Sequence, residues 1–146
     1  MFNKTLATFG LLFSLVFISH NSHAEEQFEL GDYTLYYTLF NSTFVPADIA
    51  RAYQLKRSKY EWLLNVVVNK NGEHGGVPIK LSGNHKNLMA QQKMLQFNEI
   101  KETGTVYYLA PVRVNGEEIL HFELSVLLPN EAVPHTIKFT DKVISD

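Results

Sequence analysis

The sequence predicts an all-β protein folded as an antiparallel β-sandwich. Tyr, Phe, Val and Ile, which favour strands, are frequent along the chain. About seven short segments alternate between apolar and polar residues, and turn residues separate them roughly every 8–12 positions. The chain contains no internal repeat, low-complexity tract or linker. This pattern is typical of a single sandwich domain.

The first predicted strand covers Asp32–Phe40, where aliphatic and aromatic residues alternate with Thr and Tyr. A short helix is expected over Pro46–Gln54, because Pro is favoured in the first helical turn and Ile49 and Tyr53 align at i, i+4. A helix of about two turns is too short to form a second layer. We therefore expect it to lie across the sandwich as a lid.

The second strand, Tyr60–Asn69, is apolar on both faces and is predicted to be central. Lys70-Asn71-Gly72 is a hairpin signal, and a third strand is expected over Val77–Leu81. Pro78 lacks a backbone donor, so this third strand should lie at an edge or contain a bulge.

Residues Ser82–Gln92 are polar and predict an irregular segment. Asn115-Gly116 is the clearest turn of the chain, because this pair fits the type I′ geometry of a tight hairpin. Four further strands complete the prediction: Lys93–Ile100, Thr105–Val114, Glu117–Leu128 and Thr136–Thr140.

The N-terminus carries an export signal. Lys4 precedes the apolar run Leu6–Ile18, and Ser22-His23-Ala24 places small residues at the −3 and −1 positions of a cleavage site. The run is shorter than the roughly 20 residues that span a bilayer. We expect removal of residues 1–24, leaving 25–146 as one exported, periplasmic domain without a membrane anchor.

Composition limits the possible functions of the exported domain. Removing 24 of the 146 residues leaves 122, enough for one packed core. The chain has no cysteine, which excludes disulfides, thiolate metal sites, a catalytic Cys and a lipoprotein anchor. Lys4 is the only charged residue lost, so 12 basic and 15 acidic residues remain, a net charge of −3. This charge argues against a general affinity for nucleic acid or anionic membranes.

No catalytic signature stands in the sequence: metalloprotease, hydrolase, phosphate-loop, calcium-loop and dinucleotide motifs are all missing. The chain is therefore predicted not to be an enzyme and to need no cofactor. His121 and Glu123 share one face of a strand and could form half of a metal site or an acid–base pair. The favoured interpretation is an exposed polar face.

His85, Met89 and Met94 raise a second possibility, because exported copper proteins use His and Met ligands. Met side chains also fill gaps in a core, and this structural interpretation is favoured. A small exported metal-handling protein of copper type, using His85, Met89 and His121, is the alternative function.

Two loops flanking the short helix are the candidate partner-binding site. Asn41-Ser42-Thr43 matches a glycosylation acceptor, but a turn at the strand exit is its favoured role. Arg57 could bind a carboxylate or phosphate, or else cap a carbonyl or pair with Glu61. The helix should bring both loops to one end of the sandwich. The predicted partner-binding residues are Asn41, Ser42, Thr43, Phe44, Lys56, Arg57 and Lys59.

Three segments give a family resemblance over essentially the whole exported domain. The first segment is Asn41–Phe44, which follows the strand that begins at Gly31-Asp32-Tyr33. The second is Arg57-Ser58-Lys59, which precedes the strand Leu63–Val68, and the third is Tyr107–Ala110. In these motifs the chain resembles the small exported proteins of proteobacteria grouped as domain-of-unknown-function family 4426. The resemblance implies an immunoglobulin-like periplasmic sandwich and carries no activity, cofactor or site residue with it.

The leading functional hypothesis is a non-catalytic periplasmic binding or adaptor domain that acts through loops or a strand edge. Its partner is expected to be a protein or a small anionic ligand. A hydrolase ranks behind the metal-handling alternative, because no catalytic triad supports it.

Overall fold

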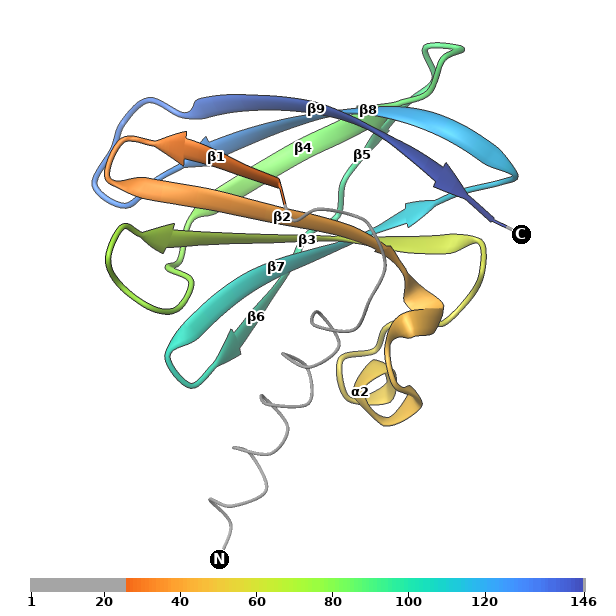
Figure 1. Ribbon diagram of the computed structural model, residues 1–146, viewed down its shortest axis with the longest axis horizontal. Coiled ribbons are helices and arrows are strands. Elements are labelled where there is room, and N and C mark those ends of the chain that lie inside the picture. The colour runs from red at the N-terminus through yellow and green to blue at the C-terminus, as the bar shows by residue number, and fades with distance from the viewer. Residues whose placement is uncertain (1–25, 146) are drawn as a thin grey trace, which may run out of the picture.

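The computed structural model describes residues 26–145, which form two antiparallel sheets packed face to face (Figure 1). The predicted β-sandwich is thus confirmed, with nine strands in place of about seven. No helix among these residues is long and apolar enough to cross a membrane. The five-stranded sheet has the order β1 (Glu26–Leu30), β2 (Tyr33–Asn41), β3 (Glu61–Lys70), β7 (Thr105–Arg113) and β6 (Asn98–Glu102). The four-stranded sheet has the order β5 (Gln92–Met94), β4 (Lys80–Lys86), β8 (Glu117–Leu127) and β9 (His135–Ile144).

β3 is the middle strand of its sheet, as its two apolar faces predict. One face, with Trp62, Leu64, Val66 and Val68, packs into the core between the sheets. Its other face supplies Leu63 to a smaller apolar cluster on the outside of the five-stranded sheet. A strand that is apolar on both sides must have a covering layer on both sides, and here the second cover is the short helix.

The helix α2 (Ala47–Ala52) lies over the outer face of the five-stranded sheet, at the end drawn on the right of Figure 1. Pro46 occupies the N-cap position and Tyr53 the C-cap. Ile49 is fully buried against the sheet, so the predicted helix and its apolar face are confirmed. Gln54 then takes a left-handed conformation (φ +56°), which turns the chain back towards β3.

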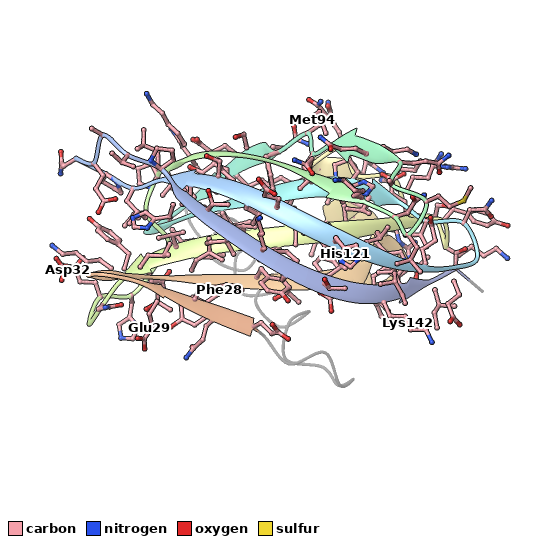
Figure 2. All side chains as sticks on the ribbon, turned by 90° about the horizontal axis from the view of Figure 1, so that it is seen from above. Phe28, Glu29, Asp32, Met94, His121 and Lys142 are labelled. Atoms are coloured by element: carbon pink, nitrogen blue, oxygen red, sulfur yellow. The ribbon has the colours of Figure 1, made fainter. Side chains whose placement is uncertain are left out.

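Aromatic rings form a row through the core between the sheets. The ring of Tyr37 stacks on Phe139 with centroids 3.7 Å apart, and Phe139 stacks on Phe122 at 4.8 Å. Phe28 of β1, labelled in Figure 2, packs at the Tyr37 end of the row, and His85 of β4 stands at the other end, beside Phe122. Because the chain has no cysteine, this packing holds the two sheets against each other, and strand pairing holds each sheet together.

The Asn115-Gly116 turn differs most clearly from the prediction. It does not close a hairpin, because β7 and β8 belong to different sheets. Gly116 has a positive φ of +71° while Asn115 does not, so the type I′ geometry is also wrong. The Gly116 N–H donates to Ser145 Oγ at 2.7 Å, and Val114 still bonds to Tyr60. These contacts let the turn step from one sheet to the other.

Two further predicted strands are also divided between the two sheets. The predicted strand Lys93–Ile100 splits into β5 and β6, with Leu95 buried in the core between them. Of the predicted strand Val77–Leu81 only the last two residues are strand, because Pro78 interrupts pairing after the bridge of Asn69 to Gly76.

The prediction that the polar segment Ser82–Gln92 is irregular is wrong, because this segment supplies most of β4 and opens β5. Ser82, Asn84 and Lys86 alternate towards the solvent side of a strand that pairs with β8 throughout, whereas Gly83 and His85 are buried. β1, which the sequence analysis did not identify, adds an edge strand beside β2. β9 also extends further than the predicted Thr136–Thr140.

Candidate functional site

The two predicted loops meet at the α2 end of the sandwich, as their positions around the helix predict. Ser42, in the 3-10 turn η1 (Ser42–Phe44), is the main link. Its Oγ donates to the carbonyl oxygen of Ser58 at 2.9 Å and accepts from the Ser58 N–H at 2.9 Å. Asn41 Nδ2 donates to the carbonyl oxygen of Lys59 at 2.9 Å. The loops are therefore locked to each other side by side.

Asn41 is buried and structural. Its Oδ1 accepts from the backbone N–H of Thr43 at 2.9 Å and from the Thr43 hydroxyl at 2.7 Å. The side chain thus caps the 3-10 turn with its oxygen and holds the neighbouring loop with its amide nitrogen. This is the strand-exit turn favoured for the segment, and it leaves the Asn41 side chain inside the protein.

The solvent side of these loops combines aromatic rings with cations. The Phe44 side chain is 66% exposed and that of Tyr60 is 38% exposed. Lys59 Nζ lies 5.1 Å from the centre of the Tyr60 ring, and the Arg113 guanidinium lies 5.9 Å from it. Both distances suit cation–π contacts. We call the exposed residues Phe44, Lys56, Arg57, Lys59, Tyr60 and Arg113 the end-loop surface.

The cations of the end-loop surface have no acidic partners among residues 26–145. The ion pairs found there all involve other residues, so no carboxylate lies within 4 Å of these four charges. Arg57 Nη2 donates to the carbonyl oxygen of Thr43 at 3.1 Å, the carbonyl contact considered from the sequence. That single bond orients a group that has five N–H donors. An anion could still bind to the remaining ones.

Tyr60 and Arg113 are the members that sequence reasoning missed. The sequence places Tyr60 and Arg113 in two different predicted strands, 53 positions apart in the chain. The pairing of β3 with β7 sets Glu61 opposite Arg113 and so brings them to the same end. The only signal in the sequence for this contact is that one predicted strand begins with an aromatic residue, Tyr60, and another ends near a basic residue, Arg113.

A half-buried hydrogen-bond network beside α2 supports this end of the molecule. Tyr53 at the helix C-cap and Tyr107 of β7 both donate their hydroxyls to Glu102 Oε1, at 2.8 and 2.7 Å. Burial, and then these bonds to the carboxylate, raise the pKa of both phenols above the ordinary value. The phenols stay protonated and tie the helix to β6 and β7.

The residues considered for metal binding do not converge. His85 pairs with Phe122 and points into the core, whereas His121 pairs with Lys86 and points outward. Met89 is 79% exposed at the turn between β4 and β5. Within the described chain, no three His, Cys, Asp or Glu side chains come together as a possible metal site.

His121 and Glu123 lie on the outer face of the four-stranded sheet, beside a shallow hollow of about 380 Å³. His121 Nδ1 is 2.7 Å from Thr140 Oγ1, and Glu123 lies 3.8 Å from Lys138 Nζ. In Figure 2 His121 lies over β8 and β9, and Met94 marks the opposite edge of the same sheet. His121 and Glu123 thus belong to the exposed polar face that the sequence analysis favours for them.

Comparisons with known proteins identify relatives of the whole domain. The family described as "Domain of unknown function (DUF4426)" matches residues 27–146. A crystal structure of a DUF4426 family protein from Pseudomonas aeruginosa PAO1 has 29% sequence identity and a TM-score of 0.76, covering 86% of this chain and 99% of that one. No curated protein matches the chain.

Two structures of FetP from uropathogenic Escherichia coli strain F11 share the fold. A copper-bound variant has 12% identity and a TM-score of 0.62, covering 84% of this chain and 96% of FetP. FetP as isolated has 13% identity and a TM-score of 0.61, covering 83% and 94%. At these identities the likeness concerns the fold alone.

Proposed function

The chain belongs to the DUF4426 family, and from that premise we propose that it is a non-catalytic periplasmic binding domain whose end-loop surface captures an anionic partner. The partner presents carboxylates or phosphates beside an apolar or aromatic group. The observation that carries the proposal is the set of four exposed cations, without acidic partners in the part of the chain that the structure describes, around the exposed rings of Phe44 and Tyr60.

The physical basis is preorganisation. The hydrogen bonds from Asn41 and Ser42 fix both loops before any partner arrives, so little conformational entropy is lost on binding. Aromatic rings and Arg are the side chains that contribute most to binding energy at interfaces, and here they stand together on a rigid sheet end. Lys56 and Lys59 add positive charge, which speeds the approach of an anion.

The test compares two triple variants with the same change in net charge. Lys56→Glu, Arg57→Glu and Lys59→Glu together should abolish partner capture from the native periplasm, because the reversed charges repel an anionic partner. Every replaced side chain is exposed, so the fold should be kept. The control reverses three lysines outside this surface: Lys70→Glu, Lys101→Glu and Lys138→Glu. Both variants should unfold at nearly the wild-type temperature, since exposed charges contribute little to stability.

Co-purification with quantitative mass spectrometry gives the readout, repeated at low and high salt. Proteins or ligands that the control variant retains and the end-loop variant loses identify the partner. Phe44→Ser should weaken the same capture while leaving the net charge unchanged. If the folded end-loop variant retains everything that wild type retains, these residues are a solvated loop and the proposal is wrong.

Copper handling remains the alternative function, and the fold shared with copper-bound FetP is its only support. Because His85, Met89 and His121 point to different parts of the domain, we expect no tight site for Cu(I), Cu(II) or Zn(II). Calorimetric titration of the exported protein decides between the two functions. A stoichiometric site tighter than about 1 µM, abolished by His85→Ala or Met89→Ala, would favour metal handling.

A further inference from the structure

The turn between β4 and β5 exposes two apolar side chains at a protruding tip. Leu88 is 69% and Met89 79% exposed, and Figure 1 shows the hairpin reaching beyond both sheets at the upper right. Isolated exposed apolar residues are common, but here two adjacent ones stand together at the turn of a protruding hairpin. Leu88 and Met89 are called the tip.

The backbone around the tip is already hydrogen-bonded within the hairpin. Asn87 Oδ1 accepts from the N–H groups of Met89 and Gln91, both at 3.0 Å. The Asn87 carbonyl accepts from the Ala90 N–H at 3.0 Å, and its N–H donates to the Gln91 carbonyl at 3.2 Å. Ala90 is held in a left-handed conformation (φ +61°). Because these N–H groups already have partners within the hairpin, they would lose no hydrogen bond to water if the tip entered an apolar medium.

The charged side chains of the hairpin itself are all basic, while the neighbouring strand β8 contributes Glu123 opposite Asn84. Residues 74–98 contain no Asp or Glu, in a chain with 15 acidic residues, and include Lys80, Lys86 and Lys93. Lys93 is paired with His85, so the two side chains share one face of the hairpin. Lys86 follows His85 in β4 and therefore projects from the opposite face. The two exposed ammonium groups therefore flank the tip on both sides and stand back from it.

We propose that this hairpin docks the exported protein on a bilayer that carries anionic phospholipids. Leu88 and Met89 enter the headgroup–acyl boundary, and Lys86 and Lys93 bind the lipid phosphates while their aliphatic stems lie along the surface. The net charge of the domain is negative, so the attraction is local to this acid-free segment. A convex tip with lysines behind it matches the depth order of a bilayer, with acyl chains beneath phosphates.

The lack of cysteine makes a clean experiment possible, because Met89→Cys creates a single labelling position. With a polarity-sensitive fluorophore at this position, the exported protein is mixed with vesicles of phosphatidylethanolamine and phosphatidylglycerol. The emission should shift to the blue, less so at high salt, and not with phosphatidylcholine vesicles. Val133→Cys, at a 75% exposed apolar residue of the β8–β9 loop, is the matched control and should not shift.

Two variants separate the apolar and ionic contributions. Leu88→Asp with Met89→Asp should lower vesicle co-sedimentation by about tenfold or more, because carboxylates are costly at bilayer depth. Lys86→Gln with Lys93→Gln should weaken binding and reduce its salt dependence. All substituted side chains are exposed, so the thermal unfolding curve should stay as in wild type.

The proposal is overturned by no shift at position 89 with anionic vesicles, or by an equal shift at position 133. A shift at position 89 that appears with periplasmic extract but not with vesicles would make the hairpin a protein-docking element, and it too would refute membrane docking. The end-loop variant tests a separate surface, so either proposal can fail without the other.

Discussion

His85 shows how its position within a strand decides what a titratable side chain does. It is 6% exposed, stands at the end of the aromatic row, and its Nδ1 has no hydrogen-bond partner among the described residues. Burial lowers the pKa of the imidazole, and the charge of Lys93 lowers it further, against a smaller opposing effect of Glu118. His85 is therefore neutral at pH 7 and behaves as a core residue.

This burial predicts that stability falls in mild acid. Below about pH 6.5 the unfolded chain binds a proton at His85 that the folded protein binds only at lower pH, so unfolding is favoured as the pH falls. Above that value the contribution is complete. The unfolding temperature of wild type, measured from pH 7.5 to pH 5, should drop more than that of His85→Phe. His74→Gln, at an exposed loop position, should keep the wild-type dependence, and parallel curves for wild type and His85→Phe would contradict the prediction.

At the scale of an element, β3 makes contacts on all of its sides. Its core-facing row is nearly continuous, it pairs with β2 and β7 on its two sides, and its other face meets α2. Trp62 begins the row and is 8% exposed, beside the loops that form the end-loop surface. A change at this position affects the core directly and the site through the strand.

Trp62→Ala should destabilise the domain by about 3–5 kcal/mol, because it removes a large buried side chain and leaves a cavity. Chemical denaturation followed by circular dichroism measures the loss, and the fluorescence of wild type should have the blue-shifted maximum of a buried indole. Tyr60→Ala, at the neighbouring exposed position, is the control and should cost far less. A loss under about 1 kcal/mol for Trp62→Ala, or a solvent-like emission maximum, would mean that Trp62 is not buried.

At the scale of the whole molecule, the sequence predicts a signal segment followed by one sandwich domain without cysteine. The predicted signal peptide, residues 1–24, and the cleavage site lie outside the described residues. The family match begins at residue 27, just after that predicted site. Both proposed surfaces belong to the domain that would remain after cleavage.

Cleavage after Ala24 is the prediction at this scale, from Ser22-His23-Ala24 behind the apolar run. Expressed with its own leader in a Gram-negative host, the protein should appear in the periplasmic fraction, and N-terminal sequencing should begin at Glu25. Ala24→Arg should block processing and leave full-length protein, because a small residue is needed at −1. A periplasmic product that retains Met1 would refute the assignment.

The sequence by itself determined the period-2 strands, the buried row of β3, the position of α2 and the two loops beside it. These are local properties, because alternation and capping act over a few neighbouring residues. Only the tertiary structure decided which sheet each strand joins: Asn115-Gly116 resembles a hairpin turn, yet it links two sheets. It also decided that Arg113 stands beside Tyr60 and that His85 and His121 face opposite ways. Such placements depend on pairing between residues far apart in the chain, and single-chain periodicity carries no information on it.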